Sequence, residues 1–416
     1  MSASSQPTLS RMAWLVVALL WPVALLNYLD RQMLASMKYS VMADVPTIGT
    51  EANWGFMLGQ FKWVYALLSP VGGYVADRFS RRLTICASLF VWSAVTWWTG
   101  HVHSYHELLT ARSLMGISEA FYIPAALALI TDYHAGRTRS RAVGLHQMAI
   151  YCGVIVGGFG GYAADAPDVG WRRAFDACGL FGMAYAIPLA LLLRDPRRSA
   201  EVSGDRAASP GRTLLELLTN ASFILLVLYF TLPGLAGWVV RDWMPAILKQ
   251  QFNIGQGRAG VAATLYWQVA AIVGAIAGGW LADRWVRRNV RGRIYVSALG
   301  MAMIIPAMFG VGNADKLITA VSFLALFGLG WGFFDCNNMP ILCQIARPHL
   351  RATGYGIMNL VGISCGGVAD WVFGTLRDRR VPLNAIFGVF AGATLLSVVL
   401  VLCIRPRAEL TTAEPT

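Results

Sequence analysis

The ten residues GYVADRFSRR at positions 73–82 recur at positions 279–288 as GWLADRWVRR, 206 residues further along the chain. Six of the ten positions are identical in the two copies. The tetrapeptides RAVG at 141–144 and RATG at 351–354 form a second pair, at a spacing of 210. Two matches at nearly the same spacing indicate a duplicated unit, with one copy in each half of the chain.

The chain around these repeats is strongly apolar. Of the 416 residues, 56% are hydrophobic and 13% are charged, whereas a soluble domain carries about 25% charged residues. Twelve apolar stretches are long enough to cross the hydrocarbon core of a bilayer as a helix, which takes about 20 residues. Their long unalternating runs favour helices over a membrane barrel. We therefore expect an all-α membrane protein with twelve transmembrane helices in two six-helix halves.

The predicted spans are six in each half. Those of the first half are 12–36, 54–77, 82–103, 106–133, 138–164 and 172–194. Those of the second half are 218–248, 258–284, 291–313, 315–346, 350–377 and 382–404. The halves comprise residues 1–194 and 214–416, and the Arg-, Ser-, Ala- and Gly-rich segment 195–213 is expected to be a flexible cytoplasmic linker.

The formal net charge is +12, and the positions of the basic residues along the chain indicate the membrane topology. The basic residues lie mainly in the polar segments between the spans, so we expect no nucleic-acid partner. The positive-inside rule then places both termini in the cytoplasm. The first apolar run is too long for a signal-peptide core and lacks a convincing small-residue cleavage site, so we expect it to remain in the mature protein.

No other functional class is supported by the motifs. The seven cysteines all fall inside predicted spans without metal-ligand spacing, so we expect no disulfide, no metal site and no cofactor. The sequence has no paired-histidine metal motif, no nucleophile elbow and no phosphate-binding Walker loop. We therefore do not expect an enzyme.

Four ionisable residues inside the predicted spans are the strongest indication of function. The first span carries Asp30 and Arg31, and the fourth carries Arg112 and Glu119. A charge at bilayer depth is costly, so such residues normally face a cavity. Arg112 and Glu119 are nearly two helical turns apart and share one helix face, and Asp30 reaches a depth similar to Arg112. The sequence thus predicts an ion pair between Asp30 and Arg112, and a static buried ion network is the alternative to a functional site.

The string G-x-x-A-D-R-x-x-R-R, which follows the second span of each half, resembles the signature loop of the major facilitator superfamily, and the resemblance covers the whole chain. It implies a latch between two six-helix halves, in which a small Gly lets helices approach closely and the Asp pairs with Arg or with a helix N-terminus. A solvated basic turn is the alternative. The matching residues are Gly73, Asp77 and Arg78 in the first copy and Gly279, Asp283 and Arg284 in the second. Glycines at four-residue spacing also predict close helix packing, namely Gly153, Gly157, Gly161, Gly274, Gly278, Gly362 and Gly366.

Two motifs resemble signatures of the anion:cation symporter family, which includes carriers of sugar acids and sialic acid. They are NYLDR at 27–31 and RSLMGISEA at 112–120, the second followed by Pro124. By this resemblance, Asp30 and Glu119 accept protons, Arg31 holds the substrate carboxylate, and Arg112 couples the two processes. Spinster-type lipid transporters have very similar motifs, so the resemblance includes both families.

Further polar and aromatic residues are candidates to line a substrate cavity, although ordinary helix packing explains any one of them equally well. They are Tyr28, Asn27, Lys62, Tyr65, Gln147, Tyr151, Trp267, Asp335, Asn338 and Asn359. Lys62 has no charged neighbour on its own predicted helix, so it is either a second substrate anchor or the partner of Asp335.

These observations predict a secondary active transporter. We expect proton-coupled symport of a small organic anion, a sugar acid or another carboxylate, by alternating access of the two halves. Export of a lipid, another amphipathic molecule or a drug is the alternative. The expected setting is the bacterial inner membrane, with protons, one small-molecule substrate and the lipid bilayer as partners of a monomer.

Overall fold

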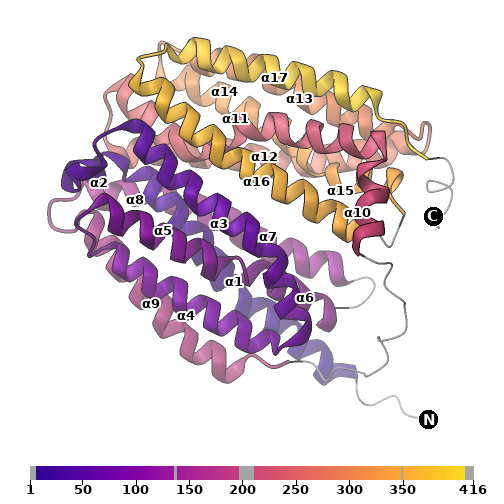
Figure 1. Ribbon diagram of the computed structural model, residues 1–416, viewed down its shortest axis with the longest axis horizontal. Coiled ribbons are helices and arrows are strands. Elements are labelled where there is room, and N and C mark those ends of the chain that lie inside the picture. Colours follow the sequence, from indigo (N-terminus) through magenta and orange to yellow (C-terminus); the bar gives the residue numbers. More distant parts are fainter. Residues whose placement is uncertain (1–5, 135–137, 196–209, 348–349, 408–416) are drawn as a thin grey trace. The chain divides into compact units, whose positions relative to one another are not determined.

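The computed structural model describes residues 6–134, 138–195, 210–347 and 350–407 (Figure 1). All regular elements in these ranges are helices. The first ten are α1 (Gln6–Ser36), α2 (Lys38–Asp44), the short 3-10 helix η1 (Pro46–Ile48), α3 (Glu51–Arg78), α4 (Arg81–Thr99), α5 (Tyr105–Glu119), α6 (Tyr122–Tyr133), α7 (Arg139–Gly158), α8 (Gly160–Asp165) and α9 (Gly170–Leu192). The others are α10 (Pro210–Leu218), α11 (Ala221–Phe252), α12 (Gln256–Val286), α13 (Gly292–Gly312), α14 (Leu317–Asp335), α15 (Asn338–Ile345), α16 (Arg351–Asp378) and α17 (Leu383–Cys403).

Ten segments of the described chain are long and apolar enough to cross a membrane. The helices α3 and α4, with 28 and 19 residues, are less apolar. The polar residues Gln60 and Lys62 interrupt the apolar sequence of α3, although the helix itself is continuous. Several Trp, Ser and Thr residues lower the hydropathy of α4. With these two helices the protein has twelve membrane-crossing segments in two sets of six, as the sequence predicts.

The described helices group into two compact units. The first contains the described residues up to 195 together with 242–261, and the second contains the described residues from 210 to 241 and from 262 to 407. The segment Asp242–Val261, which the sequence assigns to the second half, therefore groups with the first unit. The predicted linker 195–213 lies mostly outside the described residues, and its last residues begin α10.

Two predicted spans, 106–133 and 315–346, are broken helices. The first consists of α5 and α6, and the second of α14 and α15, with two residues between the helices in each case. Pro124 and Pro340 explain the breaks, because a proline has no N–H to donate to the carbonyl four residues earlier and its ring crowds that carbonyl. Those carbonyls belong to Ala120 and Cys336, which follow the last residues of α5 and α14. The predicted span 138–164 is also divided, at Phe159 between α7 and α8.

Close helix packing at glycine is confirmed within each unit. A Cβ atom on Gly153 or Gly157 of α7 would overlap the backbone of α1 at Leu25 or Leu29. In the second unit, α16 packs the backbone at Gly366 against the Trp238 ring of α11. Small residues thus allow pairs of helices to approach to backbone distance.

The glycines of the repeated loop behave differently from the prediction. No described atom lies within 4 Å of a Cβ built on Gly73 or Gly279. The close contacts fall one residue earlier. A Cβ on Gly72 would lie 3.0 Å from Cα of Phe121, and one on Gly278 would lie 2.9 Å from Cα of Phe333.

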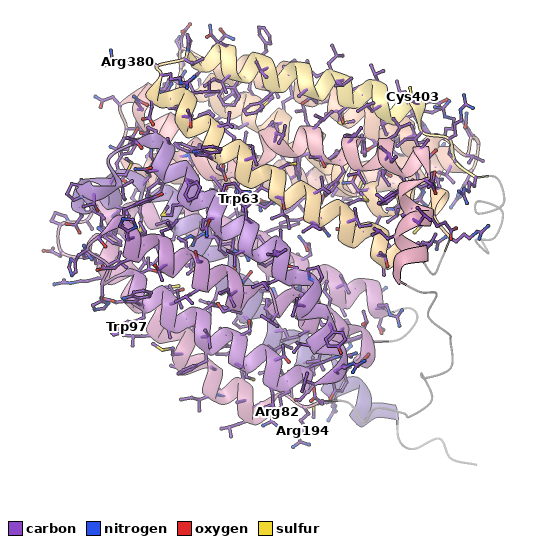
Figure 2. The ribbon with its side chains drawn as sticks, in the orientation of Figure 1. Trp63, Arg82, Trp97, Arg194, Arg380 and Cys403 are labelled. Atoms are coloured by element: carbon purple, nitrogen blue, oxygen red, sulfur yellow. The ribbon has the colours of Figure 1, made fainter. Side chains whose placement is uncertain are left out.

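The first unit has its charged loops and its apolar core in separate places. Its core contains the fully buried Trp92 and Tyr122, whose rings meet edge to face at a centroid distance of 5.3 Å. α9 packs along α4, and Arg82 and Arg194 lie at the same end of this helix pair while Trp97 lies toward the other end (Figure 2).

Candidate functional site

Three charged side chains of α1 and α5 are buried in the first unit, and a fourth is partly buried. Asp30, Arg112 and Glu119 are 1%, 3% and 0% exposed, and the Arg31 side chain is 16% exposed. Burying a charge is unfavourable unless it is paired or hydrogen-bonded. The contacts of these four side chains therefore define what the site can do.

Arg31 and Glu119 form an ion pair. The Nε atom of Arg31 donates to Oε2 of Glu119 at 2.6 Å, and its Nη2 atom donates to Oδ1 of Asn27 at 3.2 Å. Asn27 precedes Arg31 by one helical turn on α1, so the helix itself positions this second acceptor. The Arg31 charge is thereby neutralised inside the protein.

Three aromatic rings surround the Arg31 guanidinium. Its Cζ atom lies 4.8 Å from the ring centroid of Tyr28, 4.6 Å from that of Phe61 and 5.1 Å from that of Tyr65. Phe61 also lies 4.5 Å from the Cζ atom of Arg112. The Phe61 ring thus contacts both guanidinium groups, and aromatic faces attract cations.

Asp30 and Arg112 are not paired with each other, contrary to the sequence prediction. The hydroxyl of Thr96 on α4 donates to Oδ2 of Asp30 at 3.0 Å, and the other Asp30 oxygen has no hydrogen-bond partner among the described residues. Arg112 instead directs Nη1 at the Met115 sulfur, 2.9 Å away. No described carboxylate lies within ion-pair distance of Arg112, and its Nε atom has no hydrogen-bond partner there. The site therefore contains one closed ion pair and two incompletely satisfied charges.

Lys62 has a different partner from either of the two that its sequence suggests. Its ammonium group forms an ion pair with Asp242, which lies on the part of α11 that belongs to the first unit. Lys62 is 4% exposed. The pair joins α3 to a segment from the second sequence repeat.

The remaining predicted lining residues lie on several helices. Tyr28, Asn27 and Tyr65 contact Arg31, as described above, whereas Gln147 is exposed on α7 and Tyr151 is half-buried against the core of the first unit. In the second unit, Trp267 and Asn338 are buried, Asn359 is half-buried and Asp335 is exposed.

The predicted latch residues have local contacts. Arg78 lies over the Tyr74 ring at 4.7 Å, and Arg284 lies over the Trp280 ring at 5.8 Å. Asp283 accepts from Nη2 of Arg293 at 3.2 Å, within the second unit. The side chain of Asp77 lies outside the described part of the structure.

Two residues of this site, Phe61 and Thr96, are not among those predicted from the sequence. Phe61 could have been found, because it lies one turn before Tyr65 on α3 and next to Gln60 and Lys62. Thr96 could not be recognised from the sequence. A Thr hydroxyl in an apolar helix commonly donates to a backbone carbonyl one turn earlier, as Thr96 also does to that of Trp92. Only the packing of α4 brings it to Asp30.

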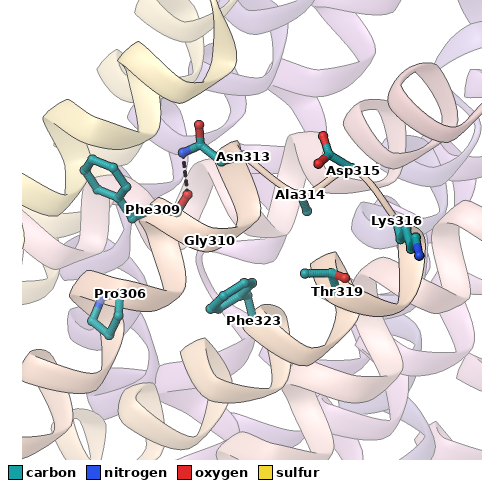
Figure 3. A pocket seen from close by; sticks show the side chains of 9 residues that line it. All are labelled: Pro306, Phe309, Gly310, Asn313, Ala314, Asp315, Lys316, Thr319 and Phe323. Carbon is teal, nitrogen blue, oxygen red and sulfur yellow. Dashed lines mark hydrogen bonds between the residues drawn. The ribbon is translucent and has the colours of Figure 1, made fainter.

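The described residues contain no group of His, Cys, Asp and Glu that could hold a metal ion. A cavity of about 680 Å³ lies in the second unit at the turn between α13 and α14. Figure 3 shows that Phe309 and Phe323 line it together with Asn313, Asp315 and Lys316. None of the predicted site residues lines this cavity.

The family model described as Major Facilitator Superfamily matches residues 20–369. The chain belongs to the Major Facilitator Superfamily. As a member of this superfamily it is a multi-pass membrane transporter and not an enzyme.

The relatives of this superfamily member carry different names. It is 32% identical over 394 residues to human protein spinster homolog 1, covering 88% of this chain and 73% of that protein. It is 27% identical over 373 residues to an MFS-type efflux pump of Mycolicibacterium smegmatis, covering 88% of this chain and 85% of that protein. It is 24% identical over 387 residues to the probable L-galactonate transporter of Escherichia coli, covering 89% of this chain and 84% of that protein. Its relatives thus include both a spinster protein and a probable transporter of a sugar acid.

The fold of this superfamily member also matches a solved structure. A bacterial homolog of the human lysosomal transporter spinster, in an inward-facing and unoccupied conformation, superposes with a TM-score of 0.77 at 19% sequence identity. The match covers 98% of this chain and 97% of that one.

Proposed function

We propose that the protein is a proton-coupled symporter of a small organic anion, a sugar acid or another carboxylate. The observation that carries this proposal is the Arg31–Glu119 ion pair beside Arg112, a buried cation without a described carboxylate partner. Such a site has an excess of hydrogen-bond donors for a carboxylate once Glu119 no longer occupies Arg31.

Competition for Arg31 couples the proton to the anion in this proposal. Glu119 and a substrate carboxylate are alternative partners of one guanidinium. A proton on Glu119 removes its negative charge and frees Arg31 for the substrate. Loss of that proton restores the ion pair and displaces the substrate. Binding of the proton and of the anion is therefore linked, and each favours the other.

Asp30 and Arg112 supply the second part of the proposed mechanism. Asp30 is buried and directly precedes Arg31 in the sequence. One of its carboxyl oxygens accepts a hydrogen bond from the Thr96 hydroxyl, and the other has no hydrogen-bond partner among the described residues. Its free oxygen is a second place for a proton. Arg112, held against Phe61 and Met115, responds electrostatically to the charge on both carboxyl groups. We assign Asp30 and Glu119 to proton binding, Arg31 to the substrate and Arg112 to coupling.

The setting of the transporter belongs to the same proposal. We infer that both termini lie in the cytoplasm, which the distribution of basic residues between the spans supports. We also infer that the protein acts as a monomer in a bacterial inner membrane. The repeated loops with Gly73, Asp77, Arg78, Gly279, Asp283 and Arg284 are proposed as the latch of alternating access, supported by their recurrence at one spacing.

Transport into proteoliposomes tests the function. Uptake of labelled L-galactonate and D-gluconate is measured with and without an inward proton gradient, for the native chain, Glu119→Gln and Arg31→Ala. We expect gradient-driven accumulation by the native chain. Glu119→Gln should lose accumulation at least tenfold but keep substrate exchange, because a neutral side chain leaves Arg31 free while no proton is carried. Arg31→Ala should lose both activities.

Glu107→Gln is the matched control. Glu107 is an exposed carboxylate in the first turn of the same helix, α5. We expect accumulation by this variant to equal that of the native chain. Equal accumulation by Glu119→Gln and the native chain would remove Glu119 from the coupling mechanism.

Movement of an amphipathic lipid is the second candidate function. The 32% identity to human protein spinster homolog 1 favours it. The same proteoliposomes, loaded with a fluorescent lysophospholipid, separate the two functions. Lipid movement without uptake of either carboxylate would establish the second candidate and exclude symport of sugar acids.

A further inference from the structure

The cavity between α13 and α14 has no role in the transport site. Its volume of about 680 Å³ falls in the range of about 300–1,000 Å³ that is usual for sites of small molecules. The two helices pack along each other, and both belong to segments that are apolar and long enough to cross a membrane. The cavity lies beside the turn 313–316 that joins them, so a molecule bound there contacts the second unit at the membrane surface.

The walls of the cavity are one stripe of residues on each helix. The stripe of α13 consists of Pro306, Phe309, Gly310 and Asn313, and that of α14 consists of its N-cap residue Lys316 with Thr319 and Phe323. Residues three, four and seven positions apart lie on the same face of a helix. The cavity is therefore a groove between two helix faces and runs in the direction of the helices.

The polarity of the lining changes along this groove. In Figure 3, Asn313, Asp315 and Lys316 lie at the turn, whereas Phe323 lies further along α14 and its ring points into the cavity. The seven residues from Lys316 to Phe323 correspond to about 10 Å of helix. The polar headgroup layer on each side of a bilayer is about 5–7 Å thick. The groove thus extends from the headgroup layer into the hydrocarbon.

The charged lining residues are Asp315 and Lys316, which are adjacent and have opposite charges. Both side chains are exposed, and no ion pair joins either of them to another described residue. Adjacent Cα atoms are about 3.8 Å apart, so the two charges can contact neighbouring groups of one ligand. A phosphate and a primary ammonium group separated by two carbon atoms, as in phosphatidylethanolamine, have the complementary charges at a matching separation.

The deeper end of the groove is aromatic. The Phe323 ring lies over Gly310, where a Cβ atom would be 2.4 Å from the ring, so only a glycine leaves room for it. Phe309 is 59% exposed on the neighbouring face of α13. These rings provide an apolar surface at the depth where the acyl chains of a phospholipid begin.

We propose that this groove binds one molecule of phosphatidylethanolamine. Asp315 accepts hydrogen bonds from the lipid ammonium group, Lys316 donates to the phosphate, and an acyl chain lies against Phe309 and Phe323. The lipid is a bound component of the second unit and not a cargo, so the inference is independent of the proposed symport.

Binding of three phospholipids to the purified full-length chain tests this site. Native mass spectrometry in detergent gives the Kd of the first bound dioleoyl lipid for phosphatidylethanolamine, phosphatidylcholine and phosphatidylglycerol. We expect phosphatidylethanolamine to bind at least threefold more tightly than the other two. Phosphatidylcholine has three methyl groups in place of the N–H donors, and phosphatidylglycerol has no cation for Asp315.

Substitutions at the two charges have different expected effects. Asp315→Asn should raise the Kd of phosphatidylethanolamine about threefold, the effect of one exposed ion pair, and make it equal to that of phosphatidylglycerol. Lys316→Gln should raise the Kd of all three lipids about threefold, because each has a phosphate, and should preserve their order. Thr319→Trp fills the groove from an exposed position and should weaken all three about tenfold.

Controls separate this site from other lipid contacts and from misfolding. Asp168→Asn removes an exposed carboxylate from the turn between α8 and α9 and should leave every Kd unchanged. Melting temperatures in detergent identify any misfolded variant. Glycerophosphoethanolamine, which has the headgroup without acyl chains, should not displace the lipid at an equal concentration.

Three results would overturn the inference. If the native chain binds the three lipids equally, or if Asp315→Asn keeps the preference for phosphatidylethanolamine, Asp315 does not recognise the ammonium group. If Thr319→Trp binds lipid as tightly as the native chain, the lipid lies elsewhere. If glycerophosphoethanolamine displaces the lipid, the site recognises a soluble phosphate ester. Carboxylate uptake is not measured here, so a failure of the proposed symport would not affect these outcomes.

Discussion

Arg31 shows how a buried charge is made tolerable at the scale of one residue. It has a carboxylate, an amide oxygen and three aromatic rings around it. Arg112, in contrast, has a ring and a thioether sulfur. Removing one partner of a buried ion pair is strongly unfavourable, so the Arg31–Glu119 pair can be exchanged only for an equivalent anion. This is the physical basis for competition between Glu119 and a substrate.

Phe61 is predicted to position both guanidinium groups. Phe61→Leu keeps most of the volume but removes two cation–π contacts, each worth about 0.5–2 kcal/mol. We expect KM for the transported carboxylate to rise about fivefold or more, with little change in melting temperature. Phe56→Leu is the control, because Phe56 lies five residues earlier on the same helix and therefore on a different face from Phe61. An unchanged KM in Phe61→Leu would mean that the ring only fills space.

At the scale of helices, the breaks at Ala120 and Cys336 place an acid at the end of α5 and of α14. In a continuous helix, every backbone N–H and C=O group near mid-span would be hydrogen-bonded within the helix. Pro124 and Pro340 prevent this, and Gly72 and Gly278 on the neighbouring helices leave room for the residues at the break. Sequence and packing therefore act together at each break.

The glycine pairs 72/73 and 278/279 give a matched test of this packing. In Gly72→Ala the new methyl group meets backbone atoms of Ala120 and Phe121, and in Gly278→Ala it meets Cα of Phe333 and the sulfur of Cys336. Such overpacking costs about 1–3 kcal/mol. We expect the melting temperature in detergent to fall by several degrees. Gly73→Ala and Gly279→Ala have open space and the better helix propensity of alanine, so they should be neutral or stabilising. A loss of stability in Gly73→Ala equal to that in Gly72→Ala would contradict the predicted packing.

At the scale of the whole molecule, the sequence repeat and the compact units do not coincide. The segment 242–261 belongs to the second repeat but groups with the first unit. Its contacts there include the Lys62–Asp242 ion pair and the hydrogen bond from the Gly257 N–H to the carboxylate of Asp165 at 2.9 Å. These polar contacts fix the segment in its unit.

A double-mutant cycle measures how strongly Lys62 and Asp242 are coupled. Lys62→Met and Asp242→Asn should each lower the melting temperature, because each leaves a largely buried charge without its described partner. The double variant should lose less than the sum of the two, with a coupling energy of about 1–3 kcal/mol. If the stability losses of the two single variants simply add in the double variant, the Lys62–Asp242 ion pair does not stabilise the packing of the segment 242–261.

The proposed membrane orientation is tested by labelling. In intact cells, a membrane-impermeant maleimide should modify Asp315→Cys, in the turn between α13 and α14, from outside. It should modify Ser203→Cys, in the segment between the halves, only after the membrane is permeabilised. The native chain supplies the background from its own seven cysteines. The reverse pattern would place both termini outside.

The helical membrane fold and its duplication follow from the amino-acid sequence alone. Apolar runs of bilayer length leave helices as the way to satisfy the backbone, and the repeated loops record the two copies. Ionisable residues at bilayer depth also pointed to Asp30, Arg31, Arg112 and Glu119 without any structure, because charges there are rarely retained without a role.

Which charged side chains form ion pairs depends on how the helices pack. Helical periodicity gives the face of a side chain but not the rotation and depth of one helix against another. It therefore predicted Asp30 with Arg112, where packing instead joins Arg31 to Glu119 and Lys62 to Asp242. For the same reason, the sequence could not predict that Phe61 contacts two arginines or that Thr96 donates a hydrogen bond to Asp30. A shift of one residue along a helix turns a side chain by about 100°, which is enough to exchange one partner for another.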